Sequence, residues 1–283
     1  MIRGLYTSAS GMTSQMYNLN AISNNLANVD LTGYKRDVSA FKAFPELLLR
    51  RLNDDGIIQF PFGSVDAAPI IGKLGTGVEF NELYTVFDQG AMKQTDNPFD
   101  MALDGKGFFS IQVGNEEKYT RNGSFLINDE SFLVTKDGHL VLGENGPIQI
   151  KENNFVIDED GVIYQNSSLA DDYTNLVSLE ENEWDNLEVV DRLKIVNFRD
   201  NRLRYLKKTG NSFWIATEQT GPAAIVQEAR PKVRSGFLES ANVNPVTEMV
   251  KMIEVNRTYE ANQKMIQTED SLLGKLINEA VRV

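Results

Sequence analysis

Residues 1–36 constrain the fold more than any other stretch, because apolar side chains recur there at alternating steps of three and four. The stripe consists of Ile2, Leu5, Ala9, Met12, Met16, Leu19, Ser23 and Leu26. This spacing is a heptad seam in which Ser23 is the one polar member. A segment rich in Asn, Asp, Thr and Gly, from Asn28 to Lys35, then breaks the period. The pattern predicts an amphipathic helix that begins near Ile2 or Leu5, ends near Asn28 and needs another helix to cover its seam.

The C-terminal segment, residues 236–283, offers a partner for this helix. Pro245 suits a first helical turn, and Asn244 suits the capping position before it. A second stripe with the same alternating steps follows, with two polar members: Met252, Val255, Tyr259, Asn262, Ile266, Glu269, Leu273, Leu276 and Ala280. A helix of about 38 residues would be about 57 Å long, which is typical of a coiled coil. We therefore expect the two terminal helices to pair as a coiled coil, each burying the seam of the other.

The middle of the chain, residues 76–235, has the pattern of short strands. Asn-Gly and Asp-Gly turns between apolar runs are the strongest short signal for a hairpin, because type I′ turns need positive φ. Five of them occur within a short stretch, at Asp104-Gly105, Asn122-Gly123, Asp137-Gly138, Asn145-Gly146 and Asp160-Gly161. No long helical period interrupts the runs, which disfavours a TIM barrel or a doubly wound sheet. The fold class predicted is α+β, mainly an antiparallel β body between two terminal helices.

This reading divides the chain into four consecutive parts. Residues 1–36 form an N-terminal axial helix and motif, and residues 37–75 form an irregular connecting segment interrupted by Pro45. Residues 76–235 form the β domain, which carries an acidic insertion near 165–192. Residues 236–283 form the C-terminal axial helix.

Composition excludes several classes of function. The net charge of −12 disfavours binding to nucleic acid or an anionic membrane, both of which need a basic surface. Residues 1–36 carry three Lys or Arg against one Asp, and residues 236–283 carry five against seven acidic residues, so the acidic charge lies in the middle. The chain has no cysteine, which excludes disulfides and thiolate chemistry. No apolar run is long enough to span a membrane, and the N-terminus lacks the features of a cleaved secretory signal.

A search for catalytic chemistry finds no convincing site. His139 is the single histidine, and its position just after Asp137-Gly138 is better explained as a strand residue beside a turn. The glycine-rich run at 72–77 lacks the Gly-Lys-Ser/Thr ending of a phosphate loop. The acidic run at 158–161 lacks the alternating ligands of a calcium loop and suits a hairpin turn better. We expect no catalytic residue, no cofactor, no metal and no small-molecule substrate, and predict that the chain is not an enzyme.

The outer face of the N-terminal helix is uncharged. It consists of Thr7, Ser8, Ser10, Thr13, Ser14, Gln15, Asn18, Asn20, Asn24 and Asn25. A solvated helix face usually carries Lys and Glu, whereas small hydroxyl and amide side chains can pack closely and form hydrogen bonds. The face therefore favours a helix packed on several sides in an assembly, and the plainer alternative is a helix that covers one side of a globular core.

Two long motifs give the chain a family resemblance. The segment Ser23-Asn24-Asn25-Leu26-Ala27-Asn28-Val29-Asp30-Leu31-Thr32-Gly33-Tyr34-Lys35 resembles the N-terminal signature of the bacterial flagellar axial proteins, the rod, hook and hook-associated proteins. Asp30 is a mild departure, since Asn is frequent there. Residues 235–244, 248–250, 252–254, 257–262 and 266–268 resemble the C-terminal motif of that family. Residues 1–12 and blocks within 89–138 look most like the rod members.

The resemblance implies a structural subunit of the flagellar basal-body rod that is exported through the flagellar type III apparatus without a cleaved signal. Terminal helices of such subunits form the inner core of a tube in the periplasm that transmits torque from motor to hook, and their β domain lies outside. The implied partners are other rod and hook subunits, further copies of the chain and the export apparatus. The motifs favour the proximal rod, with the distal rod as the alternative.

The residues expected to carry assembly are Leu5, Met12, Leu19, Leu26, Asn28, Gly33, Tyr34, Met252, Tyr259, Ile266 and Leu273. Two competing classes are a rod-associated enzyme that cuts peptidoglycan with paired carboxylates, and a β-domain adaptor capped by its own termini. Neither a lysozyme-like helical domain nor a distinct carboxylate pair supports the enzyme.

Overall fold

The chain folds into two units that interleave along the sequence, as seen in a computed structural model that describes residues 2–50, 57–66, 70–150, 155–166, 188–210, 212–226 and 230–280. Unit 1 comprises residues 1–26, 37–84 and 245–283, and unit 2 comprises residues 27–36 and 85–244. This differs from the four consecutive parts expected above. Residues 27–36 fold with the β body, and residues 37–84 fold with the terminal helices, so sequence order does not mark the boundary.

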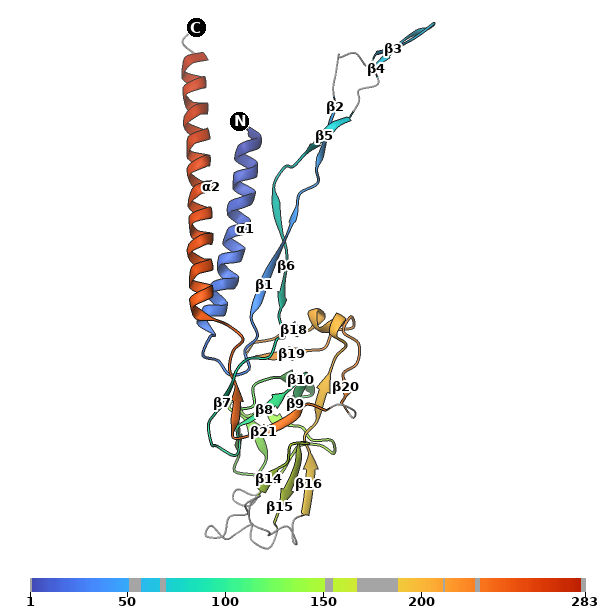
Figure 1. Ribbon diagram of the computed structural model, residues 1–283, viewed down its shortest axis with the longest axis vertical. Coiled ribbons are helices and arrows are strands. Elements are labelled where there is room, and N and C mark those ends of the chain that lie inside the picture. Colours follow the sequence, from blue (N-terminus) through green and yellow to red (C-terminus); the bar gives the residue numbers. More distant parts are fainter. Residues whose placement is uncertain are drawn as a thin grey trace. The chain divides into compact units, whose positions relative to one another are not determined.

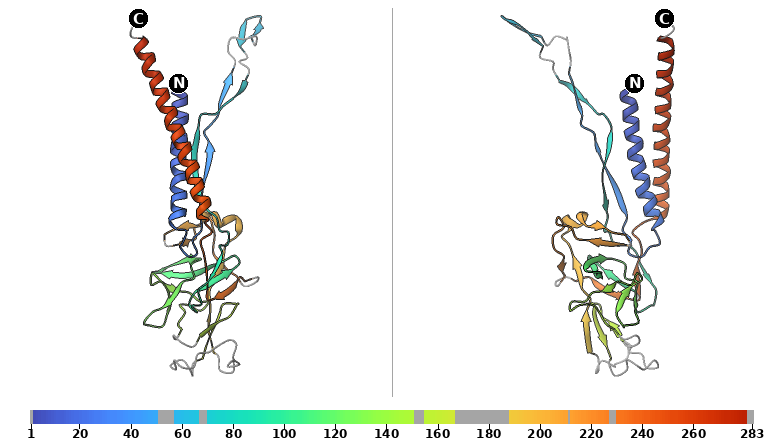
Figure 2. Two further views of the ribbon diagram at one scale, coloured as in Figure 1. Left: turned by 60° about the vertical axis from the view of Figure 1, so that its left-hand side comes forward. Right: turned by 180° about the vertical axis from the view of Figure 1, so that it is seen from behind.

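Unit 1 contains the two predicted terminal helices. Helix α1 spans Ile2–Ala27, and helix α2 spans Pro245–Ala280. Both bounds lie within a few residues of those predicted from the heptad stripes and from Pro245. The helices run side by side in opposite directions (Figures 1 and 2). Glu248 lies in the first turn of α2, where a negative charge is favourable beside the free N–H groups of a helix.

The rest of unit 1 is a two-stranded ribbon, drawn in blue and cyan in Figure 1. Its strands pair as β1 with β6, β2 with β5 and β3 with β4. Their bounds are β1 Asp37–Ala43, β2 Leu47–Arg50, β3 Ile57–Phe60, β4 Gly63–Asp66, β5 Ile70–Leu74 and β6 Val78–Thr85.

The ribbon corrects the expectation that residues 37–75 are irregular. Leu47, Leu48 and Leu49 are consecutive and all exposed, at 50%, 53% and 41%. A strand with no buried face needs no alternation of apolar and polar residues, so the usual period of two is missing from this sequence. The ribbon is instead formed by hydrogen bonds between backbone groups, which a hydropathy pattern does not detect.

Unit 2 is the antiparallel β body. Its main sheet has the order β11-β12-β13-β9-β10-β19-β18, and β17 pairs with both β9 and β20. The bounds are β9 Phe108–Val113, β10 Glu116–Thr120, β11 Phe125–Ile127, β12 Leu133–Thr135, β13 Leu140–Val141, β17 Ile195–Asn197, β18 Lys207–Lys208, β19 Phe213–Ile215 and β20 Ala224–Ile225. A short 3-10 helix, η2 (Asp200–Tyr205), precedes β18.

A second, smaller sheet and two strand pairs complete unit 2. The smaller sheet has the order β14-β15-β16, and the pairs are β21 with β8 and β22 with β7. The bounds are β7 Met92–Gln94, β8 Met101–Asp104, β14 Phe155–Ile157, β15 Val162–Gln165, β16 Glu188–Arg192, β21 Lys232–Ser235 and β22 Phe237–Glu239. Strand β16 falls inside the stretch predicted as an acidic insertion, and residues 167–187 of that stretch lie outside the described residues.

The five predicted hairpin turns have different outcomes. Asp137-Gly138 joins β12 to β13 and Asp160-Gly161 joins β14 to β15, and both strand pairs are antiparallel as predicted. Asn145-Gly146 closes a turn beside the bridge between Leu142 and Pro147. The hairpin prediction is wrong at Asp104-Gly105 and Asn122-Gly123, because the strands that flank them pair with other strands. A turn dipeptide shows where the chain bends, but it does not choose the partner strand.

The core of unit 2 consists of two apolar clusters. The larger one includes Phe109, Ile111, Phe125 and Leu133, all at most 1% exposed. The smaller one gathers aromatic side chains around Trp214, which is fully buried. No helix among the described residues is long and apolar enough to cross a membrane.

This core predicts that two leucines on neighbouring strands contribute differently to the free energy of unfolding. Leu133→Ala removes a fully buried side chain and should lower the free energy of unfolding by about 2–5 kcal/mol. Leu126→Ala, on the paired strand β11, removes a side chain that is 46% exposed and should cost less than about 1 kcal/mol. Urea denaturation of the full chain, followed by tryptophan fluorescence, measures both. Equal costs would contradict the assignment of Leu133 to the core.

Candidate functional site

The two family-like motifs meet inside unit 2 at the side chain of Glu239. Lys35 Nζ donates to Glu239 Oε1 at 2.6 Å, and Arg121 Nη1 lies 3.4 Å from Glu239 Oε2. The side chains of Lys35 and Glu239 are 0% and 1% exposed, and that of Arg121 is 5% exposed. One carboxylate therefore holds two cations in the interior of the β body. We call Lys35, Arg121 and Glu239 the buried ion cluster.

Backbone groups complete the buried ion cluster. Lys35 Nζ also donates to the carbonyl of Asp88 at 2.7 Å, and the N–H of Gly90 donates to Glu239 Oε1 at 2.8 Å. Arg121 Nη2 donates to the carbonyl of Gly105 at 2.6 Å. Hydrogen bonds to a buried charge offset the loss of water around it, and each of the three charged groups has such a bond beyond the ion pairs, although Arg121 Nε has no hydrogen-bond partner among the described residues.

Burial and the Glu239 carboxylate have opposite effects on the pKa values of Lys35 and Arg121. Burial lowers the pKa of Lys35 below its ordinary value of 10.5, and the nearby Glu239 carboxylate opposes that change. Burial likewise lowers the pKa of Arg121, and Glu239 again opposes it. In both cases the loss of water around the cation is the larger effect, so the cluster depends on its one carboxylate.

Gly33 brings the N-terminal motif into position. Its φ of 67° lies in the left-handed region, and its N–H donates to the carbonyl of Glu239 at 2.7 Å. A Cβ at this position would lie 2.4 Å from the backbone nitrogen of Asn122, so only glycine fits. The next residue, Tyr34, is 2% exposed, and the ammonium group of Lys208 lies 4.2 Å from the centre of its ring. Gly33 and Tyr34 thus contact residues of this same chain.

Asn242 joins the C-terminal motif to the same region. Its Oδ1 accepts from the N–H of Arg36 at 2.7 Å. Its Nδ2 donates to the carbonyls of Val86 and Asp88, at 2.8 and 3.1 Å. Asn28, the first residue of the predicted set in this segment, accepts from the N–H of Leu31 in a turn after α1. Residues 28–36 and 235–242 therefore form one hydrogen-bonded junction.

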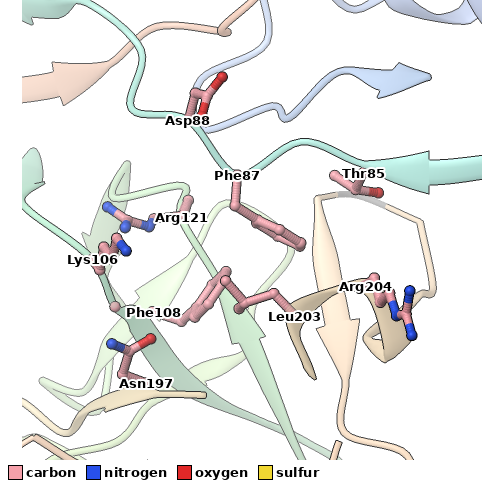
Figure 3. Close-up of a pocket in the computed structure, with 10 residues that line it drawn as sticks. Thr85, Phe87, Asp88, Lys106, Phe108, Arg121, Asn197, Leu203 and Arg204 are labelled. Carbon is pink, nitrogen blue, oxygen red and sulfur yellow. The ribbon is translucent and has the colours of Figure 1, made fainter. Parts of the chain in front are cut away.

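A cleft of about 360 Å³ lies next to the buried ion cluster (Figure 3). Phe87 and Phe108, whose ring centres are 5.4 Å apart, line it together with Arg121. Among the described side chains that line it, Asp88 is the only acidic one, so these residues offer no pair of carboxylates for acid–base chemistry. His139, the residue set aside in the sequence, stacks edge-on against Phe213. The described part of the chain holds no group of three or more His, Cys, Asp or Glu that would suit a metal ion.

In unit 1, the remaining predicted assembly residues are half-buried on the two helices. They are Leu5, Met12, Leu19 and Leu26 on α1, and Met252, Tyr259, Ile266 and Leu273 on α2. On α2 the covered stripe follows the prediction as far as Leu273, and Leu276 is 48% exposed. The apolar face of α2 was therefore well located from its heptad steps.

On α1 the contacts with α2 lie one residue away from the predicted seam. They pass through Gly4, Gly11 and Asn25, which precede Leu5, Met12 and Leu26. Asn25 Nδ2 lies 3.4 Å from the carboxylate of Glu248. These three contacts on the α1 side involve small and polar residues, and the pairing of two apolar seams as a coiled coil stays a prediction. Glycine has no apolar side chain, so a hydropathy pattern finds the neighbouring Leu5 and Met12 instead.

The ribbon covers part of the uncharged face of α1. The ring of Tyr17 stacks on Phe80 of β6 at 4.8 Å, and Ser14 Oγ donates to the carbonyl of Val78 at 3.2 Å. Asn18 Oδ1 accepts from Ser39 Oγ on β1 at 2.7 Å. The face was expected to meet other helices, but in the folded chain these side chains bond to the ribbon.

Asn25 ties the end of α1 to the start of β1. Its amide donates to the carbonyl of Asp37 at 2.8 Å and accepts from the N–H of Asp37 at 2.9 Å. Asn25 was expected on the outer face of the helix, yet it is 2% exposed. An amide that pairs with a strand backbone has no distinctive sequence pattern, so hydropathy alone misses it.

Comparisons with known proteins cover this architecture from end to end. The family model described as "Flagella basal body rod protein" matches residues 5–35, and "Flagellar basal body rod FlgEFG protein C-terminal" matches residues 234–279. A third model, "Flagellar hook protein FlgE/F/G D1 domain", matches residues 102–165. A curated relative, the flagellar basal-body rod protein FlgG of Borreliella burgdorferi, is 33% identical over 97% of this chain and 97% of its own length. The chain belongs to the flagellar basal-body rod protein family.

Two relatives from Bacillus subtilis extend the comparison. The flagellar basal-body rod protein FlgG is 30% identical over 98% of this chain and 99% of its own length. The flagellar hook-basal body complex protein FlhO is 28% identical over the full length of both chains. This rod-family chain is accordingly a structural subunit of the flagellar basal-body rod, and its place is the flagellum.

The matched segments contain every member of the buried ion cluster. Lys35 ends the N-terminal match, Arg121 lies in the central match, and Glu239 lies in the C-terminal match. Sequence reasoning had named Gly33 and Tyr34 but missed these three charged residues. Charged side chains are seldom fully buried, so their residue type does not indicate an interior position, and the one available signal was that each lies inside a motif.

The buried ion cluster predicts a large effect of removing its carboxylate. Glu239→Gln leaves two buried cations without a counter-charge and should lower the free energy of unfolding by about 3–5 kcal/mol. The control is Glu159→Gln, which breaks an exposed pair with Lys232 and should leave the denaturation midpoint unchanged. Urea denaturation measures both variants. A midpoint for Glu239→Gln equal to that of the control would show that the cluster does not stabilise unit 2.

The lowered pKa of Lys35 predicts how stability changes in alkali. Between the folded pKa and the ordinary value of 10.5, the unfolded chain binds a proton at Lys35 that the folded chain has lost. The contribution of Lys35 to the free energy of unfolding therefore rises with pH across that window and is least favourable below it. The difference between wild type and Lys35→Met, measured by urea denaturation at several pH values up to 10.5, should show this slope. A flat difference would contradict it.

Proposed function

We propose that this rod-family chain polymerises through unit 1, with its helices in the inner layer of the rod and its β body outside. The observation that carries the proposal is the large amount of apolar surface that unit 1 leaves exposed. On α2 the exposed residues are Val246, Met249, Val250, Ile253, Met265, Leu272, Leu276 and Ile277. On α1 they include Tyr6 and Met16, which are 67% and 47% exposed.

Three of the exposed residues on α2 share one face. Val246, Val250 and Ile253 recur at steps of four and three, so they share one side of the helix. At about 100° per residue, that side lies roughly opposite Glu248 and Val255, which are buried. An apolar face left open after α2 has packed against α1 needs a further partner in water. Further copies of the same chain supply it if each subunit repeats one unlike contact along a helical filament.

The ribbon adds a second apolar surface to unit 1. Leu47, Leu48 and Leu49 on β2 are exposed, as are Ile70 and Ile71 on β5, at 58% and 60%. A two-stranded ribbon of this kind is marginal in water by itself. Packing of the ribbon on neighbouring subunits would cover these side chains and stiffen the wall of the tube, which torque transmission requires.

The remaining parts of the proposal concern route and position. The chain is exported through the flagellar type III apparatus without a cleaved signal and acts in the periplasm, between the motor and the hook. Its partners are other rod and hook subunits. The sequence motifs favour the proximal rod over the distal rod. Deleting the gene and imaging the basal bodies tests the position, because a rod that stops near its base identifies a proximal subunit and a rod that stops near the hook identifies a distal one.

The competing functions make different predictions. A peptidoglycan-cutting enzyme would release soluble fragments from purified cell wall, and we expect none. An adaptor capped by its own termini would stay monomeric, whereas an axial subunit should form filaments at high concentration. Mass photometry and electron microscopy of the purified chain distinguish these cases.

The exposed face of α2 predicts a separation of folding from assembly. Ile253→Asp changes a side chain that is 52% exposed, so the chain should fold, be exported and yet fail to build a rod. Leu19→Asp and Ile266→Asp, on the half-buried stripes, should also block assembly. The matched control is Asn256→Asp, at an exposed polar position of the same helix. Swimming in soft agar and electron microscopy of basal bodies measure the outcome, and wild-type swimming of Ile253→Asp would refute the assembly role of this face.

A further inference from the structure

The two glycines of α1 face the two polar members of the α2 stripe. A Cβ at Gly4 would lie 2.0 Å from Glu269 Oε1, and a Cβ at Gly11 would lie 3.0 Å from Asn262 Nδ2. Gly4 and Gly11 are seven residues apart, and so are Asn262 and Glu269. Each long polar side chain therefore lies over a position that has no side chain.

These contacts belong to a single antiparallel register. The residue numbers of each pair, Gly4 with Glu269 and Gly11 with Asn262, add up to 273. The third contact, between Asn25 and Glu248, gives the same sum. Between Gly11 and Asn25, the same register pairs Asn18 with Val255, whose numbers also add up to 273. Both residues line the same cleft between the helices. Three independent contacts along α1 thus agree on one alignment.

We infer that Gly4 and Gly11 on α1, with Glu269 and Asn262 on α2, form a register lock that fixes how the two terminal helices of one chain pair. This inference rests on the proposed assembly through unit 1, because the register decides which apolar side chains α1 and α2 present to other subunits. The four residues are positioning residues for assembly. A polar residue at a seam position is known to select register at some cost in stability.

Slipping by one heptad breaks the match in either direction. If each α1 residue faces an α2 residue seven positions later, Asn262 lies over the side chain of Asn18, and Glu248 passes beyond the end of α1. If it faces a residue seven positions earlier, Glu269 passes beyond the start of α1, and Asn25 passes beyond the start of α2. After either slip, at least one polar residue lacks the space over a glycine or the partner on the other helix that it has in the observed register. This costs free energy in a partly buried interface.

The local chemistry of each helix is consistent with a role of these residues in the contact between α1 and α2. Glycine inside a helix costs about 1 kcal/mol relative to alanine, so two glycines in α1 weaken it unless the close approach of α2 compensates. The first turn of α1 contains no acidic residue. The Glu269 carboxylate lies beside that turn at Gly4, where a negative charge interacts favourably with the positive end of the helix.

The matched pair of variants is Gly11→Leu and Gly274→Leu. Both place the same side chain at a helical glycine, but no described residue lies within 4 Å of a Cβ at Gly274. The chain has no cysteine, so introduced cysteine pairs report the register without background. Ile22→Cys with Lys251→Cys tests the observed register, since both residues line the cleft between the helices and their numbers add up to 273. Ile22→Cys with Thr258→Cys tests a register slipped by one heptad.

The experiment oxidises purified hook-basal bodies that carry each pair and separates the products by gel electrophoresis. With native glycines and with Gly274→Leu, the first pair should crosslink within one chain at least tenfold more than the second. In Gly11→Leu this preference should be lost, and adding Asn262→Ala should restore it because the leucine then fills the vacated space. The strain with the first pair and native glycines must also swim, which tests the proposed assembly separately from the lock.

Three results would overturn the lock. An unchanged crosslink preference in Gly11→Leu would show that the glycine does not set the register. Crosslinks of the first pair that form only between chains would show that α1 pairs with another subunit. If Gly11→Leu yields no basal bodies and Asn262→Ala does not restore them, the leucine acts elsewhere and the assignment of Asn262 as its partner fails.

Discussion

The structure of unit 2 depends on one buried carboxylate. Glu239 compensates the charges of Lys35 and Arg121 in the interior, and its own backbone carbonyl accepts from Gly33. The three side chains come from parts of the chain more than eighty residues apart. None of them can be buried alone without a cost of several kcal/mol, so burying any one of the three side chains favours bringing all three segments together. The segment that follows α1 is thereby joined to the segment that precedes α2.

This junction explains the interleaved order of the two units. The chain passes from unit 1 to unit 2 after Leu26, returns at Asp37, leaves again after Tyr84 and returns at Pro245. Each passage lies close in sequence to a group bonded at the junction, such as Arg36 or Asn242. The helices and the ribbon of unit 1 thus all connect to unit 2 through segments that are hydrogen-bonded to one another.

Unit 1 is organised by a different principle from unit 2. Unit 2 buries a full apolar core around Phe109 and Trp214, whereas unit 1 leaves Ile253, Leu272 and many ribbon side chains exposed. The contacts between its helices include those of small and polar residues such as Gly4, Gly11 and Asn25. The apolar surface that remains is what the proposed assembly would bury between subunits.

The sequence by itself determined the elements with strong local signals. Both terminal helices, the covered stripe of α2 and the β body followed from heptad steps, Pro245 and turn dipeptides, because each depends on residues close in sequence. Sequence motifs also placed the chain among the flagellar axial proteins. Only the tertiary structure decided the ribbon and the partners of the strands that flank Asp104-Gly105 and Asn122-Gly123. It also decided the contacts of Gly4 and Gly11 with α2 and the buried ion cluster. These depend on contacts between distant residues, and a glycine, an exposed strand or a buried lysine has the same local pattern whether or not such a contact forms.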